Sequence, residues 1–500
     1  MNKVIIGRPE DLDRTVIAAV ARGACHLELA PGLVGALTRS RRSTLAALEG
    51  RVVYGVNTGM GAMSGLRLDA EAQRRHQDNL MIGRAVGSAP WLRRDQARAL
   101  LAARLRTFLD PAAGVSPELC RRLADLLNAD VVPAIPARGS GAAGEIIPLA
   151  HAGAALLGVG QVLDAGPIGA GGAVDASSAF AEAGLAPRSF GPKEGIAFLE
   201  GVPGLTGLAV LGSAAARVLI DQVVVGAAAS HTVIRASLDP LQPALADSDE
   251  LRVVLESLRD LRGKAEPGAL QAPVSFRVTA PALAVAMRAV AGVEAAVDRA
   301  LNAVTDSPAH LDGEFVGTFG FAGTDLTASL GALTTALVHL AELGAARLHR
   351  LLDPRVTGLA PQLSHSPGLH AGMAAVHKRA AGVTHRLRRF AVPALTGAIE
   401  TSLGQEDVQS FGFEAAECLD EVLTGLRDVL ACELLAVVQA QRLGAPSSST
   451  LDDIDAALPP GTADRPFGRD LDRIVSLLSA GTARGAADDQ FGTEQGRPAG

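Results

Sequence analysis

Residues 204–236 read GLTGLAVLGSAAARVLIDQVVVGAAASHTVIRA, and this stretch decides the fold class. Ala, Leu and Val fill it, and its few polar residues recur at helical spacing, which predicts one long helix. The same pattern predicts three more long helices, over residues 281–304, 322–352 and 413–443. Helices of this length are typical of a bundle rather than of alternating strands and helices.

The composition of the 500-residue chain also favours a mainly α fold. Hydrophobic residues make up 48% of the chain and aromatic residues only 3%, so small aliphatic side chains do most of the packing. Such side chains allow close helix–helix contact and provide few bulky strand formers. Because the length exceeds what one core usually organises, we expect three parts: an N-terminal region of short helices and loops (1–200), a long-helix bundle (201–480) and a disordered tail (481–500).

The charge pattern argues against nucleic-acid and membrane partners. The net charge is −7 and the basic residues are scattered, so we expect no basic surface for nucleic acid or anionic lipid. The most apolar stretch carries Arg217, Asp221 and Gln222 at its centre, which is costly in lipid and ordinary in a water-soluble bundle. A small-molecule substrate or a protein contact remains.

The cysteines form no recognisable metal or disulfide pattern. They lie far apart, without a CxxC pair, and the only histidine nearby is the sequence neighbour His26: Cys25, Cys120, Cys418 and Cys432. We therefore expect reduced structural thiols, no metal site and a cytoplasmic protein.

Three local features carry polar groups that could do chemistry. Tyr54, the one tyrosine, precedes the Gly-rich loop 55–61, where it could transfer a proton or be only a buried aromatic residue. GSGAAGEIIPLAH, residues 139–151, predicts a helix N-terminus directed into a small-residue loop, or a plain tight loop. Residues 405–407 and Arg277 offer charges near predicted helix ends, which are often solvated surface.

Six segments, taken in order, resemble motifs of the histidine and phenylalanine ammonia-lyase family. They extend from about residue 50 to about residue 440 and so cover nearly the whole core of the chain. YGVNTGMG (54–61) looks like the family's tyrosine loop, and GAAGEIIPLAH (141–151) resembles GASGDLAPLAH. The other four are GPKEGIAFLEG (191–201), similar to KEGLALLNGT; QAPVSFR (271–277), similar to QDPYSLR; EFVG (314–317), similar to NFHGE; and QEDVQSFG (405–412), similar to QEDHVSMG.

This resemblance implies a histidine ammonia-lyase-like fold, with a mixed N-terminal region and a central bundle of long helices. It also implies a homotetramer whose active sites draw residues from three subunits, acting on a small amino-acid substrate. In the family, an Ala-Ser-Gly triad cyclises and dehydrates to 4-methylidene-imidazole-5-one, an electrophile that captures the substrate. The tyrosine of the loop is the base.

The chain departs from the family at the position that forms this cofactor. The aligned triad is Ala142-Ala143-Gly144, and Ala143 has no hydroxyl to lose, so the exocyclic alkene cannot form. We therefore expect no 4-methylidene-imidazole-5-one and no other cofactor. Other family residues are replaced as well: the cofactor-contacting asparagine by Glu200, the substrate-binding histidine by Arg84, the aspartate after the triad by Glu145, the second tyrosine by Val274 and the NFHGE histidine by Val316. Several losses at one site indicate natural divergence.

Other positions keep the family pattern: Tyr54, Gln271, Arg277, Phe315, Gln405 and Glu406. From the resemblance we expect Tyr54, Glu200 and Glu406 to be catalytic. The expected substrate-binding residues are Arg84, Gln271, Arg277, Phe315 and Gln405. Arg277 would pair with a substrate carboxylate, which suits a planar guanidinium.

Glu200 and Arg84 are the charges that the family pattern lacks. Either they form an ion pair with each other, or Glu200 recognises a cationic or amine group. In a third alternative Glu200 is an acid/base partner of Tyr54, with a pKa raised by burial.

Without an electrophile, the β-proton of an ordinary amino acid is too weakly acidic for a phenolate to remove, so ordinary deamination should fail. The leading hypothesis is a cofactor-independent lyase, isomerase or cyclase of amino acid or secondary metabolism. Its substrate would be a carboxylate-bearing, amino-acid-derived molecule, with Tyr54 as the acid/base group. The alternatives are a non-catalytic binding scaffold, or an inactive Ser-to-Ala variant of an ordinary ammonia-lyase.

Overall fold

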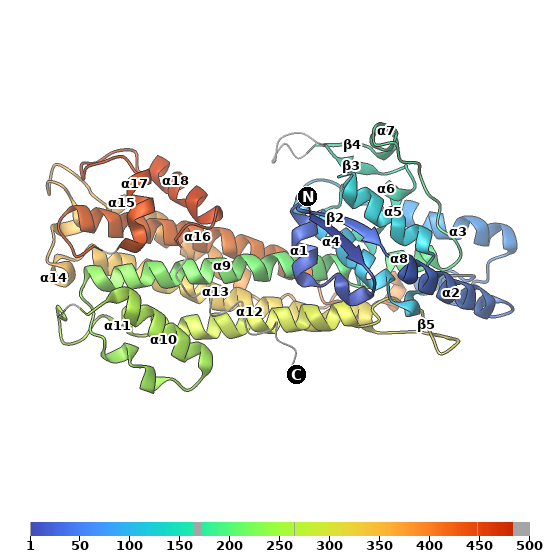
Figure 1. Ribbon diagram of the computed structural model, residues 1–500, viewed down its shortest axis with the longest axis horizontal. Coiled ribbons are helices and arrows are strands. Elements are labelled where there is room, and N and C mark those ends of the chain that lie inside the picture. The colour runs from blue at the N-terminus through green and yellow to red at the C-terminus, as the bar shows by residue number, and fades with distance from the viewer. Residues whose placement is uncertain (1, 165–171, 265, 448, 484–500) are drawn as a thin grey trace. The chain divides into compact units, whose positions relative to one another are not determined.

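The computed structural model describes residues 2–164, 172–264, 266–447 and 449–483, and it is mainly α-helical, as the sequence predicts (Figure 1). The predicted disordered tail lies outside the described residues from residue 484 onward. The chain forms two compact units, each assembled from three separate stretches. Unit 1 comprises Met1–Gly212, Val293–Leu330 and Pro393–Glu417, and unit 2 comprises Ser213–Gly292, Gly331–Val392 and Cys418–Gly500. The units therefore do not follow chain order.

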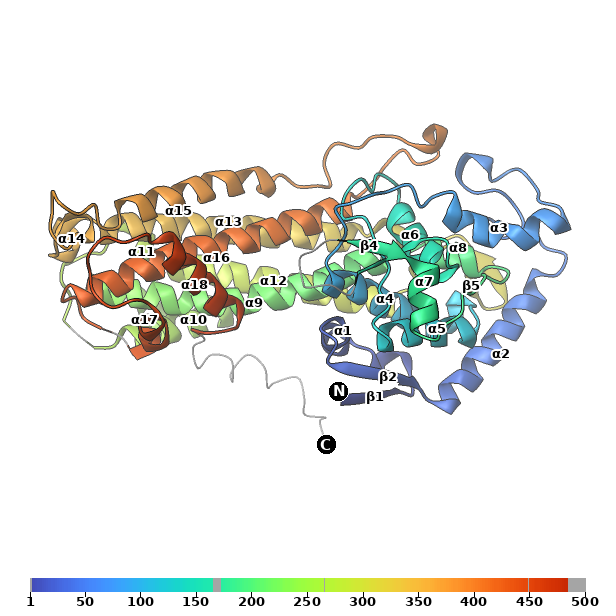
Figure 2. The same ribbon diagram turned by 90° about the horizontal axis from the view of Figure 1, so that it is seen from above.

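Four long helices contribute residues to both units. Their bounds lie within three residues of the ranges predicted from the apolar pattern: α9 is Pro203–Val233, α12 is Thr279–Asn302, α13 is Thr324–Leu351 and α16 is Gly412–Arg442. Within unit 2 these helices run side by side (Figures 1 and 2). The remaining α-helices of unit 2 are α10 (Asp249–Arg262), α11 (Val274–Arg277), α14 (Pro354–Thr357), α15 (Ala374–Leu387), α17 (Asp452–Ala457) and α18 (Gly468–Ser479).

Unit 1 combines shorter helices with three two-stranded sheets. The β1–β2 sheet is parallel, and the β3–β4 and β5–β6 sheets are antiparallel. The strands are β1 (Asn2–Ile6), β2 (Cys25–Leu29), β3 (Gln161–Leu163), β4 (Ala173–Asp175), β5 (Ala309–Leu311) and β6 (Glu314–Val316). The helices are α1 (Arg14–Ala21), α2 (Pro31–Leu48), α3 (Ala70–Ile82), α4 (Arg94–Phe108), α5 (Pro117–Asn128), α6 (Ile146–Leu156), α7 (Ala176–Glu182) and α8 (Glu194–Leu199).

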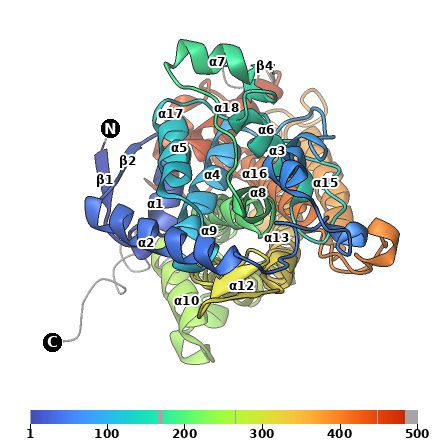
Figure 3. The same cartoon turned by 90° about the vertical axis from the view of Figure 1, so that its right-hand side faces the viewer.

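Helix α4 forms the centre of unit 1, because it is buried on nearly every side. It packs against α1 and α5, while α3 packs against α6 and α8 (Figure 3). Small side chains permit this close packing. A Cβ atom added to Gly207 on α9 would lie 2.6 Å from the backbone of Ala99 on α4, so only glycine fits there. The first turns of α9 are therefore fixed against α4.

The core of unit 2 contains a fully buried ion pair. The guanidinium of Arg347 on α13 donates to both carboxylate oxygens of Glu433 on α16, at 2.7 and 2.9 Å. Hydroxyls from two other long helices complete the network. Arg347 also donates to Thr279 Oγ1 at 3.0 Å, and Ser230 donates to Glu433 at 2.6 Å. The bidentate geometry and the added hydrogen bonds offset much of the cost of burying the two charges.

Three helical stretches of the described chain are long and apolar enough to cross a membrane, judged by length and composition only: Glu194–Val233, Thr279–Asn302 and Gly320–Leu351. The polar centre of the first stretch is satisfied inside the protein. The buried amide of Gln222 donates to the carbonyls of Leu478 and Thr482, both at 2.8 Å. All four cysteines are free thiols.

We predict that Arg347→Met lowers the free energy of unfolding by about 3–5 kcal/mol, because it leaves the Glu433 carboxylate buried without its cation. The double variant Arg347→Met/Glu433→Leu should recover most of this loss. Arg299→Met is the matched control, since its ion pair with Asp325 is exposed and contributes less than about 1 kcal/mol. Urea unfolding followed by circular dichroism measures all three. Equal losses in Arg347→Met and Arg299→Met would contradict the prediction.

Candidate active site

The triad Ala142-Ala143-Gly144 forms a tight turn just before α6. The Gly144 N–H donates to the Ala142 carbonyl oxygen at 2.9 Å, and the Ala143 N–H donates to the Glu406 carboxylate at 2.9 Å. The predicted helix N-terminus at this loop is confirmed, since α6 begins at Ile146. A cavity of about 10 Å³ lies beside the turn and is lined by Ser140, Ala142, Gly144 and Glu145, among others. The backbone is thus fixed at the position where the family builds its cofactor.

The residues present do not fit that cofactor. The ring of 4-methylidene-imidazole-5-one would join Ala142 and Gly144, whose carbonyl and N–H are in hydrogen-bond contact. The exocyclic alkene, however, requires a hydroxyl on the middle residue, and Ala143 carries only a methyl group. The functional groups next to the turn are therefore those of the surrounding side chains, such as the Glu406 carboxylate.

Glu406 is held in place by the segment that carries it. Its carboxylate accepts hydrogen bonds from the hydroxyls of Thr401, at 3.2 Å, and Ser402, at 2.8 Å, in addition to the Ala143 N–H. These three donors occupy both oxygens. Glu406 is therefore an oriented carboxylate fixed against the triad.

Tyr54 is fixed by its own glycine-rich loop. The phenol oxygen accepts a hydrogen bond from the Gly61 N–H at 2.9 Å, which closes the loop back on the tyrosine. Gly55 has a positive φ of 65°, and a Cβ atom there would lie 2.7 Å from Ile196, so the turn requires glycine. Burial raises the pKa of Tyr54, and the Gly61 hydrogen bond opposes this rise by stabilising the phenolate.

Helix α8 places Glu200 directly after its C-terminal end. The buried Arg104 guanidinium donates to the carbonyl of Ala197, at 3.2 Å, and to the carbonyl of Glu200 itself. It also lies over the rings of Phe108 and Phe198, with 5.0 and 5.9 Å between the guanidinium carbon and the ring centres. Burial lowers the pKa of Arg104 to about 10, so it stays charged at neutral pH. Arg104 thereby satisfies the last carbonyls of α8 and fixes the backbone of Glu200.

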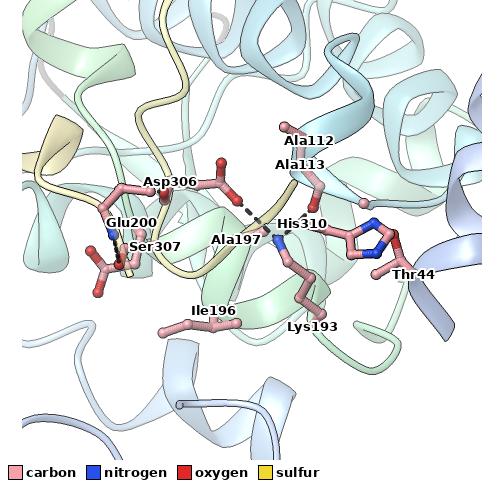
Figure 4. A network of polar contacts seen from close by, with 12 residues as sticks. Thr44, Ala112, Ala113, Lys193, Ile196, Ala197, Glu200, Asp306, Ser307 and His310 are labelled. Atoms are coloured by element: carbon pink, nitrogen blue, oxygen red, sulfur yellow. Dashed lines mark hydrogen bonds and ion pairs between the residues drawn. The ribbon is translucent and has the colours of Figure 1, made fainter. Parts of the chain in front are cut away.

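The N-terminal end of α8 is held by a second buried cation. Lys193 precedes the helix in a left-handed conformation, with φ of 68°, and its side chain is fully buried. Figure 4 shows Lys193 Nζ between two acceptors, the Asp306 carboxylate at 2.9 Å and the Ala113 carbonyl at 2.6 Å. The loop that carries Asp306 is thus tied to α8, and Asp306 lies close enough to Glu200 to act on its carboxyl group.

Glu200 is a carboxyl group with an unusually high proton affinity. Burial raises its pKa to about 8, and the nearby negative charges of Asp306 and Glu406 act in the same direction. The positive charges of Arg104 and Arg84 oppose them but do not cancel the shift. Glu200 therefore exchanges its proton near neutral pH, which agrees with the acid/base alternative predicted from sequence.

Arg84 lies near Tyr54, Glu200 and Glu406, because the charges of all three act on its pKa. Burial is the largest effect and lowers that pKa. Among the described residues, the Arg84 guanidinium makes one long hydrogen bond, to the Leu80 carbonyl at 3.4 Å, and no ion pair. The described chain shows no ion pair at contact distance between Arg84 and Glu200, although their charges act on each other.

The structure groups the other predicted residues differently. Gln405 is exposed beside Glu406, and Phe315 on β6 packs against His310, with ring centres 5.2 Å apart. Gln271 and Arg277 belong to unit 2, where Arg277 donates to the Gln271 side-chain oxygen at 3.3 Å. The contact shown for these two residues is thus the hydrogen bond between them. Unit 1 thus brings together Tyr54, Arg84, Glu200, Glu406 and the triad.

Sequence reasoning missed the residues that hold Glu200 in place. Lys193 lies in the GPKEGIAFLEG motif, so the motif pointed to this region, but the sequence gave no reason to single out the lysine. Arg104 and Asp306 stand outside the quoted motifs. Glu145 was noted only as a replacement. Its buried carboxylate accepts hydrogen bonds from the Gly204 and Leu205 N–H groups, both at 2.6 Å, and caps α9. Burial raises the pKa of Glu145 to about 7.

Comparisons with known proteins agree with the resemblance read from the sequence. The family model described as "Aromatic amino acid lyase" matches residues 12–458. The histidine ammonia-lyase of Gloeobacter violaceus is 30% identical over 486 residues, covering 93% of this chain and 94% of that protein.

Two solved structures share the fold. Tyrosine aminomutase from Streptomyces globisporus has a TM-score of 0.88 and 26% identity, and the match covers 96% of this chain and 97% of that one. Ergothionase from Treponema denticola, an ergothioneine-degrading enzyme, has a TM-score of 0.89 and 22% identity, with 96% and 99% covered. At that identity the likeness shows the fold alone. The predicted histidine ammonia-lyase-like fold is confirmed.

We predict that Glu200→Gln makes the protein more stable at alkaline pH relative to wild type. The unfolded chain releases this proton near pH 4.5, whereas the folded chain keeps it to about pH 8. The folded state therefore binds more protons in this window, and wild-type stability falls as the pH rises through it. Glutamine keeps the shape and removes the titration, so the decline from pH 5 to 8 should be shallower.

Unfolding midpoints in urea at several pH values test this prediction. The matched control is Glu71→Gln, which changes an exposed carboxylate on α3 and should follow the wild-type pH dependence. Some loss of stability with rising pH should remain in every variant, because burial also raises the pKa of Glu145, to about 7. Parallel curves for wild type and Glu200→Gln would show that Glu200 does not hold its proton in the folded state.

Proposed function

The chain belongs to the aromatic amino acid lyase family, and from that premise we propose that it is a lyase, isomerase or cyclase that works without 4-methylidene-imidazole-5-one. The proposed substrate is a carboxylate-bearing molecule derived from an amino acid. Tyr54 is the proposed acid/base group. One observation carries the proposal: Glu406 binds the backbone of a triad whose middle residue, Ala143, cannot supply the electrophile, and both Glu406 and Glu200 act on the pKa of Tyr54.

The residues around the triad suit proton transfer in both directions. Because burial raises the pKa of Tyr54, its resting form is the phenol, which must first release its proton to solvent before the substrate binds. In an elimination, the resulting phenolate removes a proton from carbon, and the electron pair of that C–H bond forms the new double bond. The bond to the leaving group breaks, and the Glu200 carboxylic acid donates its proton to that group. Glu200 suits this role because it holds a proton near neutral pH. Glu406 is the further carboxylate at the reacting centre.

The missing electrophile restricts the substrate. Either the proton removed is already acidic, or the leaving group departs more readily than ammonia. Ergothioneine meets the second condition, because its nitrogen is trimethylated and leaves as a neutral amine. A protein of the same fold is named as an ergothioneine-degrading enzyme. Ergothioneine therefore belongs in the first substrate panel, beside histidine, phenylalanine and tyrosine.

We further propose a cytoplasmic homotetramer with shared active sites. Relatives with this fold act on small molecules, and the resemblance assigns carboxylate binding to Arg277 and substrate binding to Gln271. In this proposal a neighbouring subunit supplies that pair to the group formed by Tyr54, Arg84, Glu200 and Glu406, which we call the Tyr54 cluster. Phe315 and Gln405 lie at the edges of the proposed site. No cofactor, nucleic acid or membrane takes part.

Tyr54→Phe should lower turnover about a hundredfold to ten-thousandfold, because it removes the proton acceptor and keeps the ring. Substrate affinity should change little. Product formation is followed by mass spectrometry and affinity by calorimetry, after the unfolding midpoint shows that the loop still folds. Undiminished turnover in the variant would defeat the assignment. Ligand binding without turnover in the wild type would identify a non-catalytic scaffold instead.

Ala143→Ser should not create an ordinary ammonia-lyase. Even with the hydroxyl restored, Glu200, Arg84, Val274 and Val316 still differ from the family site. The assay is product absorbance with histidine, phenylalanine and tyrosine, combined with intact mass. Deamination together with a mass lower by two water molecules would contradict the prediction and identify an inactive variant of an ordinary enzyme.

A further inference from the structure

Arg84 is the cation of the Tyr54 cluster, and among the residues that the structure describes it forms no ion pair. It follows α3 directly, after the C-cap residue Gly83, so its backbone is fixed by the end of that helix. The side chain is half-buried, and its one hydrogen bond within the described chain is the 3.4 Å contact to the Leu80 carbonyl. A guanidinium has five N–H donors, so most of its donor capacity is unused.

Neither neighbouring acid forms an ion pair with it in the described part of the chain, although the charges of Glu200 and Glu406 act on its pKa. The Glu406 carboxylate already accepts hydrogen bonds from Ala143, Thr401 and Ser402. Glu200 lies close by without an ion pair to Arg84, and its buried carboxyl keeps a proton near neutral pH. Once a substrate fills the site and displaces water, an unpaired guanidinium would be costly. A negatively charged group of the substrate would supply the ion pair that Arg84 does not make within the described chain.

We propose that Arg84 binds a second anionic group of the substrate, so that the substrate class is amino-acid derivatives with an acidic group in addition to the α-carboxylate. This inference rests on the proposed function, in which Arg277 of unit 2 takes the α-carboxylate. With the α-carboxylate assigned to Arg277, an acid bound by Arg84 is a second one at another position on the substrate. A carboxylate or a similar oxyanion matches the planar guanidinium by two parallel hydrogen bonds.

Pairs of ligands with and without a distal carboxylate test this proposal, and L-glutamine and L-glutamate are the pair of nearly equal size. We would measure binding of the full chain to trans-cinnamate and 4-carboxycinnamate, L-phenylalanine and 4-carboxy-L-phenylalanine, and L-glutamine and L-glutamate by calorimetry. In at least one pair the wild type should bind the doubly acidic member about tenfold or more tightly. Arg84→Gln should abolish this preference, and Arg84→Lys should keep part of it.

The matched control is Arg75→Gln on the same helix. Arg75 is exposed, its one ion pair is with Glu71 at 3.9 Å, and its replacement should leave the preference intact. Equal binding within every pair, or no binding in any pair, would overturn the proposal. A preference that survives Arg84→Gln would overturn it too. An equal loss of both members in Arg84→Gln would mean that Arg84 binds the α-carboxylate.

This experiment separates the inference from the proposed function, because it measures binding and not turnover. A preference that depends on Arg84, without product from any panel compound and without effect of Tyr54→Phe, would leave the substrate class standing and remove the lyase. Turnover that depends on Tyr54, without a preference for the doubly acidic ligands, would support the lyase and contradict the proposed substrate class.

Discussion

The placement of Glu200 depends on two buried cations that hold the ends of α8. Lys193 ties the N-terminal end to Asp306 and to the Ala113 carbonyl, and Arg104 binds the last carbonyls, including that of Glu200. A short helix has little stability of its own, so these tertiary bonds fix its position. Burial is the main cause of the raised pKa of Glu200, and two of these charges adjust it, because Asp306 raises the pKa and Arg104 lowers it. Residues that help to hold Glu200 in place therefore also affect its pKa.

The methyl group of Ala143 decides which chemistry this placement can serve. In an ordinary family site the electrophile of the triad lowers the cost of removing a weakly acidic proton. Here the backbone turn is kept, with its N–H bound by Glu406, and the reactive group is not available from the sequence. In the proposed function, the surrounding acid and base groups carry out the reaction, and they act at useful rates only if the substrate supplies an acidic proton or a good leaving group. With alanine at position 143, the proposed reaction therefore depends on the reactivity of the substrate rather than on an electrophile of the protein.

Much of the architecture was accessible from the sequence, because long apolar periodicity identifies long helices whatever they pack against. The ordered motifs also placed Tyr54, Glu406 and the triad in one site. The holding residues were not accessible, since Arg, Lys and Asp are usually exposed and no local pattern marks the few that are buried. Arg104, Lys193 and Asp306 acquire their roles only from contacts between distant stretches. Contacts between distant stretches also decide ion pairing, so an Arg84–Glu200 ion pair was a reasonable hypothesis from sequence although the structure shows none between them. For the same reason, a division of the chain at residue 200 could not anticipate that each unit is assembled from three separate stretches.

The charges around Tyr54 also link substrate binding to proton transfer. Arg84 lowers the pKa of both Tyr54 and Glu200, while Glu406 raises both. An anion bound to Arg84 cancels the first of these effects, so both groups hold a proton more firmly in the complex than in the free protein. For Glu200 this maintains the acid that protonates the leaving group. For Tyr54 it means that the phenolate, once formed, is a stronger base toward the substrate. A doubly anionic substrate would therefore complete the site electrostatically as well as fill it.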